Sequence, residues 1–226
     1  MYRLSFLSSG TGNLTETILR AIEKGVLKNI IPVSIISDRK SESLQLTSLF
    51  EGTSHVVKFN GSNAREEFSN HVLKIFQDEK IDISFMTFDR VLSGKILAEY
   101  KNKIINIHPS LLPAFPGYNT ITNAIEYGCK YIGATCHFID VEIDHGPIIN
   151  QALLPLNNQE DHVLIKQKLY RLRQQLALET LHAFSQNLIT VNKRDVFIKG
   201  ANYNSYPINP SLKIPAINNF LNSYGS

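Results

Sequence analysis

Short apolar runs alternate with amphipathic segments of helical length along most of the chain, and this alternation constrains the fold more than any other feature. Strands that are separated by helical patterns form βαβ units, in which the strands pair in parallel. The expected strands are 3–7, 32–36, 54–58, 81–87, 103–107, 134–139 and 148–154. The expected helices are 13–24, 42–50, 64–77, 93–100, 121–127 and 161–184. The pattern therefore predicts an α/β fold with a mainly parallel sheet and flanking helices.

The last two expected strands have no helical segment between them, which indicates an antiparallel extension near the C-terminal end of a Rossmann-like sheet. We predict one catalytic domain over residues 1–190 of the 226-residue chain. From Gly200 onward the composition shifts to Asn, Ser, Pro and Tyr without a clear period. Because Asn, Ser and Pro favour turns, we predict an irregular C-terminal extension over residues 191–226.

Composition and charge exclude several classes of protein. A net charge of +3 without a Lys/Arg cluster argues against a nucleic-acid partner. No apolar run approaches the roughly 20 residues that span a bilayer, and the N-terminal strand lacks a signal-peptide pattern, so we expect a cytoplasmic protein without a membrane partner. Cys129 and Cys136 have no metal-ligand spacing and are expected to be reduced. The acidic stretch Asp140, Glu142, Asp144 lacks further ligands at suitable spacing, so we expect no metal.

The run Asn106-Ile107-His108-Pro109-Ser110-Leu111-Leu112-Pro113 is the most informative motif in the chain. Residues two apart in a strand point to the same side, so Asn106 and His108 are expected to face one pocket. Pro109 lacks a backbone donor and ends the strand there. Polar side chains at the carboxyl end of a strand in an open α/β sheet usually line a ligand crevice. An amide, an imidazole and a distant carboxylate together suit acyl transfer to an amine.

Asp144 is the candidate carboxylate, because Gly146-Pro147 turns the chain directly into the next apolar strand and so fixes its position. His137 stands in the middle of an expected strand, where a structural histidine of the core or of its edge is the better interpretation. Arg90 follows the fourth expected strand and suits either an anionic ligand or a helix cap.

The turn Gly10-Thr11-Gly12-Asn13 joins the first expected strand to the first expected helix. Glycines allow a tight turn, and the free N–H groups at a helix start bind anions such as phosphate. The turn lacks the third glycine of a dinucleotide fingerprint and the lysine of a P-loop. A plain turn with Asn13 as the helix N-cap is an equally good interpretation.

Several motifs together resemble the folate-dependent formyltransferases, most closely those that act on glycinamide ribonucleotide. They are residues 106–113, Pro116-Gly117, Gly133-Ala134-Thr135-Cys136-His137-Phe138, and Asp144-x-Gly146-Pro147-Ile148-Ile149-x-Gln151. The resemblance extends over about residues 1–185, and its 106–151 block is highly specific.

This resemblance implies 10-formyltetrahydrofolate as the formyl donor and three catalytic residues, Asn106, His108 and Asp144. Asn106 would donate a hydrogen bond to the developing oxyanion, His108 would assist it and relay a proton, and Asp144 would orient His108 and help to take the amine proton. The donor-binding residues carried over are Arg90, Val91, Leu92, Ile139, Asp140, Val141 and Glu142. The acceptor-binding residues are Gly12, Asn13, Pro109 and Arg173.

Departures from the family concern the acceptor, which we expect to be a small phosphate-bearing molecule with a primary amine. The long C-terminal helix carries Tyr170 and Arg173 where the family has Gln and Glu, and the glycine turn lacks the family's serine. A cation in place of a carboxylate suits an anionic group, so we favour a nucleotide-activated amino sugar. Phosphoribosylglycinamide, the acceptor in purine biosynthesis, is the alternative, and hydrolysis of formyltetrahydrofolate or a noncatalytic binding role is less favoured. A homodimer is left open.

Overall fold

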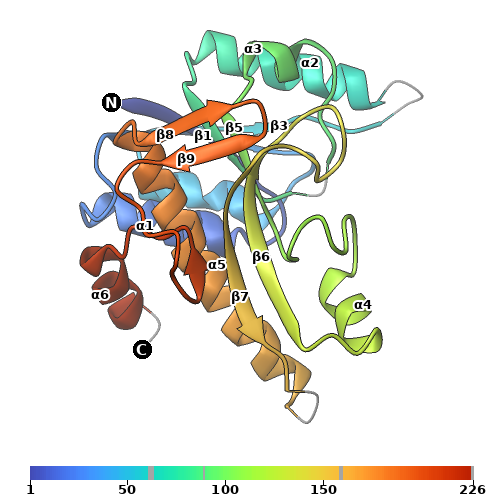
Figure 1. Ribbon diagram of the computed structural model, residues 1–226. Coiled ribbons are helices and arrows are strands. Elements are labelled where there is room, and N and C mark those ends of the chain that lie inside the picture. The colour runs from blue at the N-terminus through green and yellow to red at the C-terminus, as the bar shows by residue number, and fades with distance from the viewer. Residues whose placement is uncertain (61–63, 89, 158–159, 225–226) are drawn as a thin grey trace. The chain divides into compact units, whose positions relative to one another are not determined.

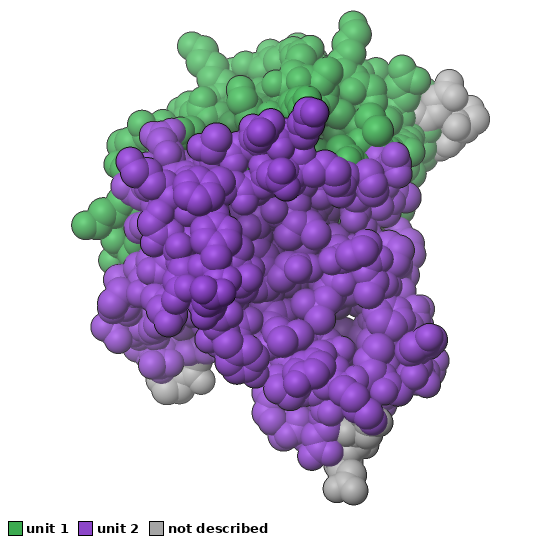
Figure 2. Space-filling model, viewed as in Figure 1, with its two compact units in different colours: residues 1–106, 138–141 green, residues 107–137, 142–226 purple. Residues whose placement is uncertain are grey.

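The computed structural model describes residues 1–60, 64–88, 90–157 and 160–224, and the chain divides into two compact units (Figures 1 and 2). The first unit comprises Met1–Asn106 and Phe138–Val141, and the second comprises Ile107–His137 and Glu142–Ser226. Most of the expected α/β alternation falls in the first unit, whereas the expected antiparallel pair falls almost wholly in the second.

The sheet of the first unit is parallel throughout, as the alternating pattern predicts. Its strands are β1 (Tyr2–Leu7), β2 (Ile30–Ser37), β3 (Thr53–Val56), β4 (Ile83–Met86) and the first residues of β5 (Ile104–His108). The strands pair in the order β5-β4-β1-β2-β3. All four residues of β4 are buried, which explains why this strand reads as a continuous apolar run rather than an alternating one.

The helices of the first unit are α1 (Asn13–Glu23), α2 (Ala64–Asp78) and the short α3 (Lys95–Glu99). Helix α1 buries Leu14, Ile18 and Ala21, which recur at helical spacing on one face. The fully buried aromatics of α2, Phe68 and Phe76, belong to the core of this unit. The helical pattern of the sequence therefore reflects one apolar face on each of these two helices.

The expected helix at 42–50 forms a 3-10 helix instead, η1 (Glu42–Leu49). Serine side chains at its start bond to each other and to neighbouring backbone, with 2.8 Å between the Ser41 and Ser43 hydroxyls and 3.2 Å from the Ser43 hydroxyl to the Ser8 carbonyl. The Ser41–Ser43 bond is local and competes with α-helical hydrogen bonding, whereas the Ser43–Ser8 bond joins residues 35 positions apart.

The second unit is built on β6 (Tyr131–Phe138) and β7 (Ile148–Pro155), which pair antiparallel as expected. A two-residue strand, β10 (Ile208–Asn209), pairs antiparallel with the other side of β7. Gly133 in β6 is required by close packing, because a Cβ atom there would lie 2.1 Å from the Ala152 carbonyl oxygen. The unit also holds α4 (Thr120–Glu126) and the hairpin of β8 (Ile189–Asn192) and β9 (Asp195–Ile198).

The longest helix, α5 (His162–Ser185), belongs to the second unit and is the expected helix at 161–184. The Asp161 carboxylate caps its start by accepting a hydrogen bond from the Val163 N–H at 2.8 Å. Its buried face includes Leu169, Leu176 and Thr180. No helix in the described part of the chain is long and apolar enough to cross a membrane.

The C-terminal extension is not irregular, contrary to the expectation for residues 191–226. Strand β10 and helix α6 (Pro215–Tyr224) both lie within it, and residues 225–226 fall outside the described part. The buried Glu179 carboxylate of α5 accepts hydrogen bonds from the Ser211 hydroxyl at 2.8 Å and the Leu212 N–H at 3.1 Å. These contacts span more than 30 residues, so no local pattern reveals them. The division into a catalytic domain over 1–190 and an extension stays a prediction.

We predict that Glu179→Ala destabilises the protein by about 1–3 kcal/mol, because it leaves a buried hydroxyl and a backbone N–H without their acceptor. Ser211→Ala removes only one donor and should cost about 1 kcal/mol. Urea denaturation followed by circular dichroism measures both values. Equal, negligible losses in the two variants would show that this carboxylate does not hold the extension.

Candidate active site

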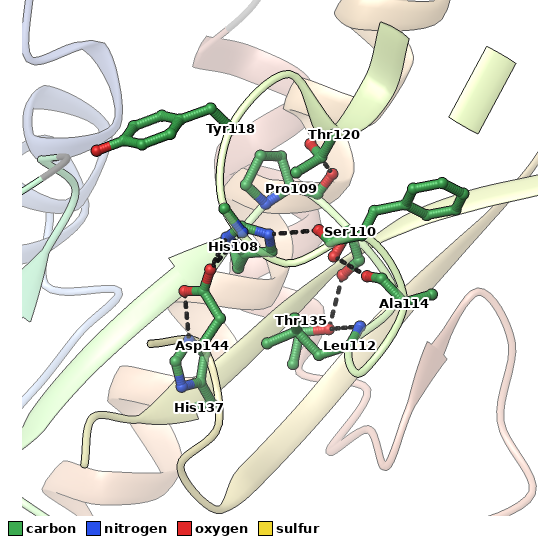
Figure 3. A network of polar contacts seen from close by, with 12 residues as sticks. His108, Pro109, Ser110, Leu112, Ala114, Tyr118, Thr120, Thr135, His137 and Asp144 are labelled. Atoms are coloured by element: carbon green, nitrogen blue, oxygen red, sulfur yellow. Dashed lines mark hydrogen bonds and ion pairs between the residues drawn. The ribbon is translucent and has the colours of Figure 1, made fainter. Parts of the chain in front are cut away.

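His108 occupies the last position of β5 and is buried, as the position before Pro109 predicts. Its Nδ1 lies 3.3 Å from Asp144 Oδ2, and its Nε2 lies 3.0 Å from the carbonyl oxygen of Phe115 (Figure 3). The structure therefore brings together two side chains that are 36 positions apart in the sequence and that were singled out there independently.

Asp144 is the centre of this network, and the backbone around it is arranged to hold its carboxylate. The residue has a φ of +54°, a left-handed conformation that aspartate tolerates better than most residues. Its Oδ2 accepts a hydrogen bond from the Gly117 N–H at 2.9 Å, and its Oδ1 lies 3.8 Å from Nε2 of the buried His137. One carboxylate thus contacts two imidazoles and a backbone donor.

The two contacts of His108 define what its ring can do chemically. Both partners, the carboxylate of Asp144 and the carbonyl of Phe115, only accept hydrogen bonds. The Phe115 carbonyl accepts a hydrogen bond from Nε2 of His108, and Nδ1 faces the Asp144 carboxylate. An imidazole beside a carboxylate can assist a developing oxyanion and can pass a proton on, which are the two tasks that acyl transfer to an amine requires.

The loop after His108 is held by a buried polar cluster from the neighbouring strands. The Thr135 hydroxyl donates to the Ser110 carbonyl at 2.7 Å and accepts from the Leu112 N–H at 3.1 Å (Figure 3). The Gln151 amide donates to both the Leu112 carbonyl and the Thr135 hydroxyl at 2.9 Å. The Ser110 hydroxyl closes the loop on the Ala114 carbonyl at 2.7 Å. Thr135 and Gln151, which belong to the sequence motifs, therefore fix the loop that carries Phe115 and Gly117.

Asn106, the third expected catalytic residue, lies in β5 within the first unit, where it pairs with Met86 of β4. It is half-buried and precedes His108 by two positions in the same strand. Alternation along a strand directs the side chains of Asn106 and His108 to the same side of β5. Its catalytic role stays a prediction.

The residues expected to bind the donor lie in two segments of the first unit, except Glu142, which is in the second. The Arg90 guanidinium is already engaged: its Nε lies 2.7 Å from Oδ2 of the buried Asp38, and it stacks 4.7 Å from the Phe59 ring centroid. The sequence suited Arg90 to an anionic ligand or to a helix cap. The contacts of its guanidinium with Asp38 and Phe59 correspond to neither role. Leu92 is buried, and its carbonyl accepts a hydrogen bond from Arg65 at 2.9 Å.

The second donor segment, Ile139–Val141 with Glu142, combines an anchored start with an exposed end. The Ile139 N–H donates to the Ile104 carbonyl at 3.0 Å within the first unit. Val141 is 71% exposed. Asp140 is half-buried and Glu142 is exposed.

The glycine turn of the first unit leaves the start of α1 without a side-chain cap. Gly12, with φ +71°, is the N-cap residue of α1, and no side chain caps this helix. The interpretation of Asn13 as N-cap is therefore wrong, and Asn13 itself is exposed. An open depression beside the turn is lined by Gly10, Thr11, Arg39, Lys40, Ser41, Glu42 and Gln45. Its two exposed cations, Arg39 and Lys40, which the sequence did not single out, stand beside one exposed carboxylate, Glu42.

The remaining acceptor candidates, Pro109 and Arg173, lie in the second unit and are half-buried. The Pro109 carbonyl accepts a hydrogen bond from the Thr120 hydroxyl at 2.9 Å (Figure 3). The Nε of Arg173 is buried without a hydrogen-bond partner. Among the described residues, no group of three or more His, Cys, Asp or Glu side chains is arranged to hold a metal ion.

Comparison with known proteins identifies the family of the chain. A family model described as formyl transferase matches residues 2–181, so the chain belongs to the formyl transferase family and is a folate-dependent formyltransferase. The phosphoribosylglycinamide formyltransferase of Mycobacterium tuberculosis is 26% identical over 190 residues, which cover 84% of this chain and 87% of that protein. The enzyme of the same name from Bacillus subtilis is 25% identical over 173 residues, covering 76% and 89%.

Solved structures show the same fold. Glycinamide ribonucleotide transformylase 1 from Symbiobacterium toebii has a TM-score of 0.80 at 28% identity, covering 88% of this chain and 94% of its own. The phosphoribosylglycinamide formyltransferase of Coxiella burnetii has a TM-score of 0.81 at 27% identity, with the same coverage. A formyltetrahydrofolate deformylase from Pseudomonas syringae, at 21% identity and a TM-score of 0.80, shares the fold over 65% of its length.

Sequence reasoning missed the part played by His137, which it placed as a structural histidine. The side chain is indeed buried, but it faces the Asp144 carboxylate. A register shift between Cys136 and His137 in the β6–β7 pairing interrupts the regular alternation at this point. An irregularity of this kind cannot be read from strand periodicity.

We predict that His137→Phe lowers kcat by up to about 100-fold, because a small displacement of Asp144 misplaces His108. Donor affinity should stay within a few fold. Steady-state kinetics and equilibrium titration of the donor measure the two effects. Unchanged kcat in a folded His137→Phe variant would show that this imidazole only fills the core.

Proposed function

We propose that the protein transfers the formyl group of 10-formyltetrahydrofolate to the primary amine of a small phosphate-bearing acceptor. The observation that carries this proposal is the Asp144 carboxylate, held between His108, His137 and the Gly117 N–H. Family membership supplies the formyl group as the unit that is transferred. The network supplies the charges and the proton route that such a transfer needs.

In this proposal each of three side chains acts on a stated atom. The amine nitrogen attacks the formyl carbon, and negative charge develops on the formyl oxygen. Asn106 donates a hydrogen bond to that oxygen, and His108 stabilises the same charge as an imidazolium. Asp144 takes the proton from the amine, directly or through a water molecule, as the new C–N bond forms. The bond from carbon to the donor nitrogen then breaks, and that nitrogen receives the proton.

For the acceptor we propose glycinamide ribonucleotide, because the relatives named above carry this activity in their names and cover most of the chain. The preference for a nucleotide-activated amino sugar, drawn from Tyr170 and Arg173, receives no support from these comparisons. It remains the second acceptor to test, since the cation at position 173 is a property of this chain. Hydrolysis of the donor is the third outcome.

The binding roles of the other residues belong to the same proposal. We assign Arg90, Val91, Leu92, Ile139, Asp140, Val141 and Glu142 to the donor, and Gly12, Asn13, Pro109 and Arg173 to the acceptor. Arg90 contributes through its backbone, because Asp38 and Phe59 hold its guanidinium. The uncapped start of α1, with Arg39 and Lys40 beside it, suits the acceptor phosphate. A cytoplasmic location and a homodimer stay predictions.

We predict that His108→Ala and Asp144→Asn each lower kcat by at least about 1,000-fold while the dissociation constant of the donor changes only a few fold. Both side chains act on charge that develops in the transition state, so their removal affects rate rather than ground-state binding. Single-turnover formyl transfer and a fluorescence titration of the donor separate the two effects. Near-normal turnover in either variant would remove the proposed mechanism.

A nonreactive folate analogue should raise the melting temperature of the protein without any amine present. A ligand that binds only the native state stabilises it by about 2.7 kcal/mol at a hundredfold excess over its dissociation constant. Differential scanning fluorimetry measures the shift, and a pterin-free p-aminobenzoylglutamate serves as the control. No shift at saturating analogue would contradict the assignment of the donor.

The acceptor is identified by incubating the protein and 10-formyltetrahydrofolate with one amine at a time. Formylation of glycinamide ribonucleotide well above that of nucleotide-activated amino sugars supports the proposal, and the reverse order supports the second acceptor. Rapid formate release in the absence of any amine indicates a hydrolase instead.

A further inference from the structure

The turn of the β8–β9 hairpin carries two cations, and one of them reaches the loop that holds Asp144. Lys193 and Arg194 are the two residues between Asn192 and Asp195, which are the paired ends of the two strands (Figure 1). A two-residue connection fixes the register of a hairpin and leaves the turn little freedom. Lys193 adopts the left-handed conformation that such turns use, with a φ of +53°. Arg194 therefore extends from a well-defined support.

The Arg194 guanidinium binds the residue that follows Asp144. Its Nη2 donates a hydrogen bond to the His145 carbonyl oxygen at 2.6 Å, and its Nη1 lies 3.1 Å from Nδ1 and 3.3 Å from Nε2 of the His145 ring. A guanidinium carries several N–H donors in a fixed plane, so one side chain can hold a backbone carbonyl and the adjoining ring together. The two residues are 49 positions apart, so no local pattern in the sequence predicts this contact.

The loop that receives this contact is exposed, yet it carries the carboxylate at the centre of the site. Ile143 and His145 are exposed, whereas Asp144 between them is only partly exposed. Asp144 has a φ of +54°, and a backbone conformation of this kind persists where the surrounding structure holds it. The Gly117 N–H holds the side chain of Asp144, and Arg194 holds the backbone of the next residue.

The hairpin is itself anchored to the C-terminal extension, which gives its turn a defined position. The Ile198 N–H of β9 donates a hydrogen bond to the Tyr203 hydroxyl at 2.7 Å, and the rings of Phe197 and Tyr203 stack with 5.7 Å between centroids and 8° between planes. Further along the extension, the Pro207 carbonyl accepts a hydrogen bond from the Leu153 N–H of β7 at 2.8 Å. A continuous set of contacts thus runs from β7 through the extension and the hairpin to the loop.

We propose that Arg194 is a positioning residue for formyl transfer, which acts through His145 to hold the backbone from which Asp144 presents its carboxylate to His108. The inference rests on the proposed function for the reaction, and on the structure alone for the hold on the loop. Contacts of an exposed arginine contribute little to global stability. A displacement of about 1 Å at a catalytic group, in contrast, can lower a rate by up to about 100-fold. Loss of Arg194 therefore affects turnover far more than it affects melting.

The test compares Arg194→Ala with Lys193→Asn, which removes the neighbouring cation of the same turn and introduces a residue that tolerates the left-handed conformation. We expect Arg194→Ala to lower kcat by about 10-fold to 100-fold, with a melting temperature close to that of the unmodified protein. The dissociation constant of a nonreactive folate analogue should change only a few fold, because the effect falls on the rate. Lys193→Asn should leave all three quantities unchanged.

Hydrogen exchange followed by mass spectrometry supplies a readout that does not depend on activity. Amides of residues 142–146 should exchange at least about fivefold faster in Arg194→Ala and at an unchanged rate in Lys193→Asn. If the unmodified protein formylates no amine, the proposed function fails, and the exchange rates alone decide whether Arg194 holds the loop.

A conservative variant separates the hydrogen bond from the ring contact. Arg194→Lys keeps a charged donor for the His145 carbonyl but lacks a second nitrogen for the ring. Its kcat and its exchange rate over residues 142–146 should therefore lie between those of the unmodified protein and those of Arg194→Ala. Should Arg194→Ala fail to fold, Arg194→Gln, which removes the charge but keeps an amide donor, takes its place, and an unchanged kcat and exchange rate in Arg194→Gln would refute the role.

Three results would overturn the inference. The first is an unchanged kcat together with unchanged exchange over residues 142–146 in Arg194→Ala. The second is an equal loss of kcat in Lys193→Asn, which would show that the charge of the turn matters and that the contact with His145 does not. The third is a lower melting temperature with faster exchange throughout β8 and β9 and no recovery in Arg194→Lys, which would indicate that Arg194 only stabilises the hairpin.

Discussion

The carboxylate of Asp144 is the interaction on which the rest of the site depends. It lies 3.3 Å from His108, 3.8 Å from His137 and 2.9 Å from the Gly117 N–H, and the residue adopts a left-handed backbone conformation to do so. A carboxylate with these partners is oriented before any ligand arrives. Such preorganisation is what lets charged groups stabilise a transition state without rearranging during the reaction.

A buried layer of hydroxyl and amide groups holds the backbone around this carboxylate in place. Thr135 and Gln151 bond to the loop that follows β5, so β6 and β7 determine where Phe115 and Gly117 present their carbonyl and N–H groups. Each of these polar groups has a hydrogen-bond partner, so the layer favours one particular conformation of the loop and does more than fill space. The motifs around Thr135 and Gln151 are thus explained as support for the loop that follows His108.

Arg173 shows the opposite arrangement, a buried group that the protein leaves unpaired. The helix that carries it is otherwise well ordered, with an Asp161 cap at its start and Glu179 holding the C-terminal extension near its end.

Helical periodicity and short apolar runs in the sequence were sufficient for β1 to β7, α1, α2, α4 and α5. It failed where local side-chain chemistry dominates, as with the serines that make η1 a 3-10 helix. It also failed for β10 and α6, whose positions depend on pairing with β7 and on the Glu179 carboxylate. Contacts between distant residues leave no local period.

The sequence by itself determined the class of chemistry and singled out His108 and Asp144, because a proline-bounded strand end and a Gly-Pro turn are local features. Only the tertiary structure decided that His137 shares the Asp144 carboxylate, that Asp38 engages Arg90, and that Arg173 is enclosed. The physical reason is that hydrogen bonds and ion pairs are set by distances of about 3 Å between atoms. Such distances exist only after the chain has brought remote residues together.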